Sequence, residues 1–275
     1  MSTIEKPSAE SVSDNSSHRQ SLVDAIAPLD RLAVGSANLL AKPIGEFDHN
    51  GERYVIPRYI HLGPRGGDAP TRIGIFAGIH GDEVEGVLAL VRFVQLLESQ
   101  PELSAGYCLF LYPVCNPTGF EDKTRHSRDG LDLNRQFWVN SNAPEVRLLQ
   151  SELVSHAFDG IISLHSDDTS DGLYGFVRGA TLTKHLLRPA LAAASELLPL
   201  NQNSTIDAFP ASEGVIHDCF PGILSAPPKV RPKPFEIILE TPRQAPQYLQ
   251  EYALVIALRT ILLEYRKFIS YAANL

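Results

Sequence analysis

The sequence predicts one α/β domain, with a mixed, mostly parallel, twisted sheet and helices on both of its faces. Apolar runs of strand length alternate along the chain with segments of helical periodicity. These runs are apolar almost throughout, as is typical of strands that are buried on both faces. The length of 275 residues, with 44% hydrophobic and 20% charged residues, suits one large globular domain.

The elements follow one another in a regular order. The expected strands cover residues 53–57, 59–62, 72–79, 107–114, 161–165 and 235–240. The expected helices cover residues 84–98, 144–155, 183–197 and 246–272. Pro144 followed by Glu145 is a favourable helix start, because proline and an acidic residue both suit the first turn. The stretch 200–234 is rich in Pro, Ser and Asn and is long for a loop, so we expect it to form the specificity pocket.

The chain divides into three parts. Residues 1–20 are rich in Ser, Glu and Asn, and we expect them to form a disordered tail. Residues 21–41 mix apolar and charged side chains, which predicts a short helix and a connector. Residues 42–275 hold the alternating strands and helices and form the predicted functional domain.

Charge and composition narrow the function classes. The formal net charge of −8 at pH 7 argues against binding to nucleic acid or to an anionic membrane. The sequence has no run of about 18 apolar residues, so we expect no transmembrane helix. The N-terminus lacks a basic head followed by an apolar run, and the three cysteines form no Cys-x-x-Cys pair. These features predict a cytoplasmic protein with reduced thiols.

Side chains that bind metals or carry protons stand where the expected strands end. His80 and Glu83 follow the run that ends at Ile79, His165 ends another apolar run, and Glu240 ends a third. In open α/β sheets the ligand lies beyond the carboxyl ends of the strands, so we expect these side chains to meet. Two histidines and a glutamate are a known catalytic zinc set, which leaves one coordination position for water.

Glu240 is the strand-ending carboxylate that is not needed as a ligand in this zinc set. A carboxylate beside a metal can take a proton from water and deliver it to a leaving amine, so we expect Glu240 to be the general base. Glu85 is an alternative ligand to Glu83. Its separation from His80, five positions, would point it elsewhere on the helix.

Three arginines lie within a short, loop-like stretch of this acidic chain, namely Arg125, Arg128 and Arg135. A guanidinium binds a carboxylate through two parallel hydrogen bonds. The stretch therefore predicts a site for an anionic group, or for the oxyanion of acyl transfer. The alternative is a set of surface salt bridges with nearby acidic residues, namely Glu121, Asp122 and Asp129.

The motifs together resemble the zinc carboxypeptidases of the carboxypeptidase A type, in the branch that includes the succinylglutamate desuccinylases and aspartoacylases. The matching motifs are His-x-x-Glu at residues 80–83, Asp-Leu-Asn-Arg at residues 132–135, the strand-ending His165, and Glu240. Each motif alone is weak, but their order and separation are specific. The match extends from about residue 72 to residue 242.

The resemblance implies roles for the residues of the metal site. His80, Glu83 and His165 would bind one zinc ion, and Glu240 would act as general base and then as general acid. Asp132 would orient the first zinc histidine, as a partner of a metal-bound imidazole commonly does.

The resemblance also implies how substrate binds. Arg125 would polarise the scissile carbonyl, and Asn134 with Arg135 would bind the substrate's terminal carboxylate. Arg128 is an extra cation near the expected oxyanion arginine, so we include it among the substrate-binding candidates. No tyrosine occurs between Tyr174 and Tyr248, so the mobile tyrosine of the digestive enzymes has no counterpart in sequence.

The residues predict a zinc-dependent metallocarboxypeptidase, with residues 42–275 as its catalytic domain. It would cleave an amide bond next to a free carboxylate, in a small peptide or an N-acyl amino acid. The alternatives are an N-acyl amino acid deacylase, a murein peptide amidase, or a zinc-binding protein that has lost turnover. Asp167 and Asp168 follow His165 closely and are either solvated loop charges or a site for a substrate amino group.

Overall fold

The computed structural model describes residues 21–65 and 69–272, so the predicted tail, residues 1–20, lies outside the described residues. Within them, ten strands form one mixed sheet. Their spatial order is β1 (Leu39–Ala41), β4 (Tyr59–Leu62), β6 (Tyr107–Tyr112), β5 (Thr71–Phe76), β7 (Gly160–Asp167), β12 (Phe235–Pro242), β8 (Tyr174–Val177), β11 (Val215–Ile216), β10 (Phe209–Ser212) and β9 (Thr205–Ile206). The predicted α/β class with a mixed sheet is confirmed.

The centre of the sheet is parallel. β6, β5, β7 and β12 run in the same direction, and almost every residue of β5, β6 and β7 is buried. Burial on both faces explains why these segments are continuous apolar runs in the sequence. Towards both edges of the sheet most pairings are antiparallel.

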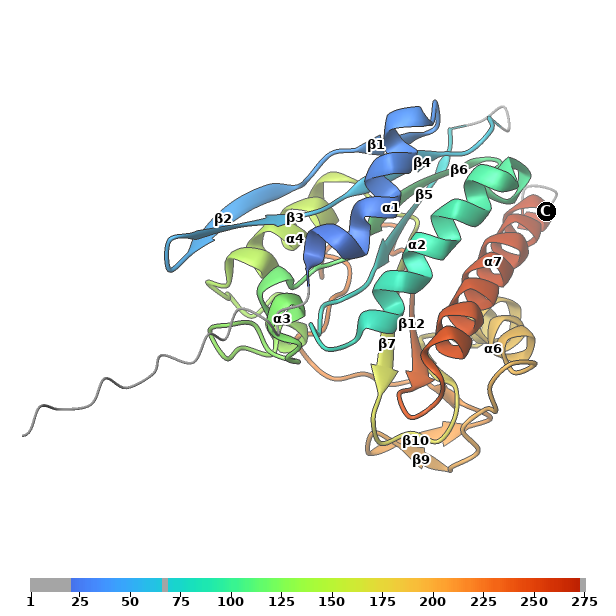
Figure 1. Ribbon diagram of the computed structural model, residues 1–275. Helices are drawn as coiled ribbons and strands as arrows, with labels where there is room; N and C mark the ends of the chain where they lie inside the picture. The colour runs from blue at the N-terminus through green and yellow to red at the C-terminus, as the bar shows by residue number, and fades with distance from the viewer. Residues whose placement is uncertain (1–20, 66–68, 273–275) are drawn as a thin grey trace, which may run out of the picture.

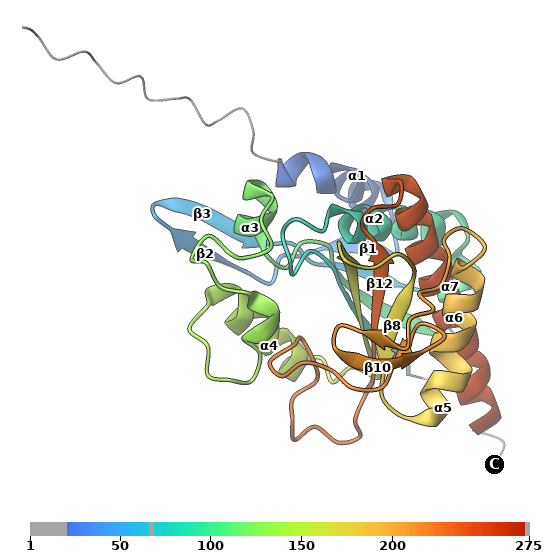
Figure 2. The ribbon, with the colours of Figure 1, turned by 90° about the horizontal axis from the view of Figure 1, so that it is seen from below.

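Helices cover both faces of the sheet (Figure 1). One face packs against α1 (Leu22–Gly35), α2 (Val84–Ser99), α6 (Arg188–Ala194) and α7 (Gln247–Ala272). The other face packs against α4 (Pro144–Ser155). Figure 2, seen from below, shows the sheet between these two layers. None of the described helices is long and apolar enough to cross a membrane.

The segment 21–41, predicted as a short helix and connector, takes part in the layered fold. α1 packs on α2, and β1 pairs with β4 and so forms one edge of the main sheet. The strand expected at residues 53–57 is β3 (Glu52–Ile56). It pairs with β2 (Gly45–His49) in a separate two-stranded sheet.

The C-terminal half contains elements that the sequence did not predict. The stretch 200–234, expected as a loop, contributes β9, β10 and β11, which extend the main sheet. The helix expected over residues 183–197 begins with a π-helical turn (Thr183–Leu187) and continues as α6. Short helical segments also follow β5 and β6 along the chain: η2 (Pro101–Ser104), α3 (Pro117–Asp122) and η3 (Leu133–Arg135), with α5 (Ala180–Leu182) after β8.

Candidate metal centre and substrate cleft

The turn between β5 and α2 places the first two predicted metal ligands. β5 ends three residues earlier than the sequence predicted, and residues 77–83 lead from it into the helix. Gly81 is required there, because a Cβ atom would collide with the backbone of Gly119. The side chains of His80 and Glu83 are buried, and Glu83 occupies the N-cap position of α2.

His80, Glu83 and His165 meet in the interior. His80 Nδ1 lies 2.6 Å from Glu83 Oε1, and His165 Nδ1 lies 2.9 Å from Glu83 Oε2. One ligand atom from each residue lies within 4.8 Å of the other two. Glu85, the alternative ligand, accepts a hydrogen bond from Ser166 Oγ at 3.2 Å and does not belong to this group.

The three ligands form an electrostatic unit. Burial alone would raise the pKa of Glu83, but the two adjacent imidazoles lower it overall. Burial would lower the pKa of His80, and the Glu83 carboxylate with Asp132 reverses that effect. The His165 pKa is lowered, because burial outweighs the attraction of Glu83. A carboxylate that stays ionised between two imidazoles is suited to bind a cation.

Asp132 holds the first histidine from its other side. Its Oδ1 lies 3.3 Å from His80 Nε2 and also accepts a hydrogen bond from the backbone N–H of Asn134 at 3.0 Å. Its Oδ2 accepts two hydrogen bonds from the Arg125 guanidinium, at 3.2 and 3.1 Å. This arrangement is the one expected of a residue that orients a metal-bound imidazole.

These residues fit a divalent transition metal. Both Nδ1 atoms are directed at one buried carboxylate, and a second carboxylate lies beside the remaining His80 nitrogen. Two histidines and a glutamate are the donor set of catalytic zinc sites with an open coordination position. It is the only such cluster of at least three potential ligands among the residues that the structure describes.

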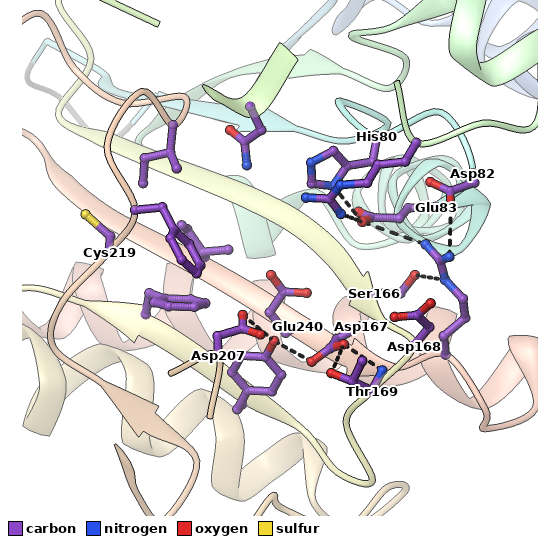
Figure 3. Close-up of a pocket in the computed structure, with 18 of the residues that line it drawn as sticks. His80, Asp82, Glu83, Ser166, Asp167, Asp168, Thr169, Asp207, Cys219 and Glu240 are labelled. Atoms are coloured by element: carbon purple, nitrogen blue, oxygen red, sulfur yellow. Dashed lines mark hydrogen bonds and ion pairs between the residues drawn. The ribbon is translucent and has the colours of Figure 1, made fainter. Parts of the chain in front are cut away.

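A cavity of about 290 Å³ opens beside this cluster (Figure 3). It is lined by the metal-ligand candidates His80 and Glu83, by polar and charged residues of the strand ends, and by aromatic and apolar residues. The remaining lining residues are Asp82, Arg125, Asn134, Arg135, Ser166, Asp167, Asp168, Thr169, Tyr174, Phe176, Asp207, Cys219, Phe220, Ile223, Ile238, Glu240 and Arg243.

Glu240 stands in the cavity beside the cluster. It is paired with His165 in the register of β12 and β7. In Figure 3 its carboxylate lies between His80–Glu83 and Asp207. No described residue donates a hydrogen bond to it. Burial, followed by the negative charges of Glu83, Asp207 and Asp167, raises the pKa of Glu240 well above its usual range.

Three of the predicted substrate-binding groups line the same cavity. Arg125 Nη1 lies 3.9 Å from Glu83 Oε1, which places this guanidinium next to the metal cluster. The Arg135 guanidinium lies over the ring of Phe220, 4.3 Å from its centroid. Asn134 is buried, and its Oδ1 accepts a hydrogen bond from the backbone N–H of Leu224 at 2.8 Å.

Arg128 does not line the cavity, which corrects the expectation that it binds substrate. Its Nε and Nη2 donate to the carboxylate of Asp122 at 2.6 and 2.8 Å, and its Nη1 donates to Glu52 at 2.9 Å and to the Tyr54 hydroxyl. Glu121 adds a fourth partner at 3.5 Å. The guanidinium is thus fully engaged in ion pairs, as the alternative interpretation of these arginines proposed.

Sequence reasoning missed several polar residues of the cavity, among them Arg243, Tyr174 and Asp207. Arg243 donates to Asp82 Oδ2 at 2.8 Å and to Ser166 Oγ at 3.3 Å, and so links the turn before α2 to β7. Tyr174 and Asp207 line the wall near Glu240. Arg243 stands three positions after Glu240 in the sequence, which was a usable signal. Nothing in the sequence pattern links the other two.

Comparisons with known proteins identify the family and the fold. The family model of the succinylglutamate desuccinylase/aspartoacylase catalytic domain matches residues 69–208. The matched segment contains His80, Glu83 and His165. No curated protein matches the chain.

Solved structures share the fold. A candidate metallopeptidase from Shewanella amazonensis has a TM-score of 0.70 at 23% identity, over 87% of this chain and 90% of that one. The metallo-carboxypeptidase from Burkholderia cenocepacia has a TM-score of 0.69 at 14% identity, over 90% and 68%. The carboxypeptidase A from Helicoverpa armigera has a TM-score of 0.64 at 14% identity, over 90% and 73%. At these identities the likeness establishes a carboxypeptidase-like fold.

Proposed function

Because this chain belongs to the succinylglutamate desuccinylase/aspartoacylase catalytic domain family, we propose that it is a zinc-dependent hydrolase that cleaves an amide bond next to a free carboxylate, as a carboxypeptidase does. One observation carries the proposal. Glu240, Arg135 and two members of the metal cluster, His80 and Glu83, line a single cavity. A metal-dependent hydrolase that recognises a carboxylate needs these three groups together.

The chemistry of bond cleavage is divided between the metal and Glu240. His80, Glu83 and His165 would hold a zinc ion, which would supply a Lewis acid that lowers the pKa of water. Glu240 accepts the proton of the attacking water, because its carboxylate lines the cavity without a hydrogen-bond donor from the described residues. It then delivers this proton to the nitrogen of the leaving amine.

The cationic side chains position the substrate and stabilise charge. Arg125 lies beside the metal cluster, so it donates to the oxyanion that develops on the scissile carbonyl. Arg135 and Asn134 bind the free carboxylate of the leaving group, because they line the cavity and Phe220 holds the Arg135 guanidinium in place. Their positions limit cleavage to amide bonds close to a carboxylate.

An N-acyl amino acid deacylase is the second candidate, and the family match favours it. Such an enzyme uses the same metal ligands, base and carboxylate site. It differs in what lies on the acyl side of the scissile bond: a small acyl group in place of a peptide.

The test combines metal removal with matched substrates. The purified protein is stripped with a chelator, supplied with zinc, and assayed on N-blocked dipeptides and on N-acyl amino acids. Each substrate has a control in which the free carboxylate is converted to the amide. We expect activity that needs zinc and a free carboxylate. The substrate type that is hydrolysed faster, dipeptide or N-acyl amino acid, distinguishes the two candidate functions. Activity that persists in the stripped protein would contradict the proposal.

A further inference from the structure

The wall of the cavity near Glu240 holds a second polar cluster that the hydrolytic chemistry does not use. The hydroxyl of Tyr174 lies 2.8 Å from Asp167 Oδ2 and 3.1 Å from Asp207 Oδ2. Tyr174 is buried, with 1% of its surface exposed, and all three residues line the cavity. Figure 3 shows Asp167 and Asp207 close to Glu240.

The hydrogen bonds of this cluster are incomplete. A phenol carries one proton and can donate it to one carboxylate at a time. The Tyr174 hydroxyl therefore satisfies only one of the two carboxylates, and the oxygen of the other needs a donor from elsewhere. The remaining oxygen of Asp167 already accepts from the backbone N–H and the hydroxyl of Thr169, both at 2.7 Å. The Asp207 carboxylate accepts only the Tyr174 hydroxyl among the described residues.

The cluster is also short of positive charge. Among the described residues no Lys or Arg forms an ion pair with Asp167, Asp207 or Glu240. Burial and then the charge of Asp167 raise the pKa of Asp207, because the two carboxylates repel each other. Arg135 and Arg125 lower the Asp207 pKa by less than burial and Asp167 raise it, so the arginines of the cavity do not offset this acidic wall.

Turn geometry alone does not explain Asp207. It occupies the two-residue turn between β9 and β10 with Ala208, and both have a left-handed φ, +51° and +65°. Asp and Asn tolerate this backbone, so the turn accounts for the residue type. It does not account for a carboxylate that reaches a buried hydroxyl 33 positions earlier in the chain and lines the cavity.

We propose that the substrate of this hydrolase carries a cationic nitrogen group, a primary ammonium or a guanidinium, in addition to its carboxylate. The inference rests on the proposed function and specifies its substrate class. The carboxylate binds at Asn134 and Arg135, and the cation binds between Asp167 and Asp207. An ammonium has three N–H donors, so it can donate to the carboxylate that the Tyr174 hydroxyl leaves without a donor.

The cation can belong to a basic side chain or to a free α-amino group, and two pairs of substrates distinguish these sources. A basic side chain is tested with an N-blocked dipeptide that ends in lysine, compared with the same dipeptide ending in Nε-acetyl-lysine. A free α-amino group is tested with a dipeptide that ends in norleucine, compared with its N-acetylated form. We expect kcat/KM to be at least about ten-fold higher for the cationic member of one pair, as a partly buried charge pair allows.

Asp207→Asn is the central variant, because asparagine keeps the left-handed turn and removes the charge. Asp167→Asn is the second, since it retains the oxygen that accepts from Thr169. Each is expected to lower the preference for the cationic substrate by about ten-fold or more. Asp171→Asn is the matched control, because Asp171 is exposed in the same β7–β8 loop and does not line the cavity. Its preference should equal that of the wild type.

A binding measurement keeps the test independent of turnover and of the metal. Calorimetry with the metal-free protein compares the two members of each substrate pair, and the cationic member of one pair should bind at least about ten-fold more tightly to the wild type but not to Asp207→Asn. If the zinc enzyme hydrolyses both members of each pair equally well, or prefers a C-terminal glutamate, the inference is overturned while the proposed function stands. If no amide is hydrolysed, the proposed function fails, and equal binding of the cationic and neutral members within both pairs then overturns the inference as well.

Discussion

The cavity has two halves that are built in different ways. The metal half is formed by the turn after β5 and by β7 and β12, which belong to the parallel centre of the sheet. The other half, which would select the substrate, is formed by β8, the β9–β10 turn and the segment around Phe220. The first half rests on long, buried strands, and the second rests on strands of two to four residues at the sheet edge.

This difference separates reaction chemistry from recognition. A zinc site and its base need positions fixed to a fraction of an ångström, which a buried parallel sheet provides. Recognition of the substrate tolerates variation, and short edge strands and loops can change without disturbing the core. We therefore expect substitutions in the metal half to affect metal binding or kcat, and substitutions in the other half to affect KM and substrate choice.

The largest expected effect comes from Glu240→Gln. The amide cannot accept the proton of the attacking water, so kcat should fall by about 10²–10⁴-fold. Zinc affinity should be unchanged, since Glu240 is not one of the three ligands. Steady-state kinetics and metal analysis of the same preparation provide the check. Full activity in this variant would remove Glu240 from the mechanism and leave the metal half without a base.

Asp132→Asn should weaken the metal site without abolishing it. Loss of the carboxylate leaves His80 Nε2 without its charged partner, which should raise the zinc dissociation constant by about 10–100-fold. Competition with a chromophoric chelator measures this constant. The control is Asp129→Asn, an exposed aspartate of the same loop, which should bind zinc as the wild type does. An unchanged constant in Asp132→Asn would show that Asp132 does not orient the histidine.

Phe220→Ala probes the recognition half. The Arg135 guanidinium loses the ring beneath it, so we expect KM to rise by about two- to five-fold while kcat stays constant. Phe220→Leu is the matched variant, because it keeps apolar bulk and lacks the aromatic ring. A fall in kcat with constant KM would contradict the assignment of substrate binding to this half of the cavity and of reaction chemistry to the other.

Arg128→Gln should have the smallest effect on catalysis. Its partners Asp122, Glu121 and Glu52 are partly exposed, so the ion pairs contribute only about 1 kcal/mol or less to the free energy of unfolding. We expect activity within about two-fold of the wild type and a slightly lower melting temperature. A large rise in KM would return Arg128 to the substrate-binding residues.

The sequence predicted that His80, Glu83 and His165 meet, because local patterns determine their positions. The apolar runs of β5, β6, β7 and β12 can be recognised in the sequence alone, and the carboxyl ends of parallel strands lie at the same edge of a sheet. His80 and Glu83 lie in one turn, and His165 and Glu240 are register partners in neighbouring strands. Strand limits were less accurate, because the turn at residues 77–79 continues the apolar run after the ladder has ended.

The recognition half was not predictable for physical reasons. Strands of two residues, such as β9 and β11, have no periodicity of their own and exist because the sheet edge offers hydrogen-bond partners. The meeting of Tyr174 with Asp207 depends on that pairing. The sequence also could not show which arginine reaches the cavity. Arg125 and Arg128 are three positions apart, and only the fold directs one into the cavity and the other to Asp122.

The most direct test of the metal site is a crystal structure of the zinc-loaded protein, with anomalous diffraction recorded on both sides of the zinc absorption edge. We predict one anomalous peak, about 2.0–2.2 Å from His80 Nδ1, His165 Nδ1 and a carboxylate oxygen of Glu83. Glu240 should lie beside the peak without coordinating the ion. A peak held by other residues, or its absence from this cluster at full zinc loading, would contradict the account.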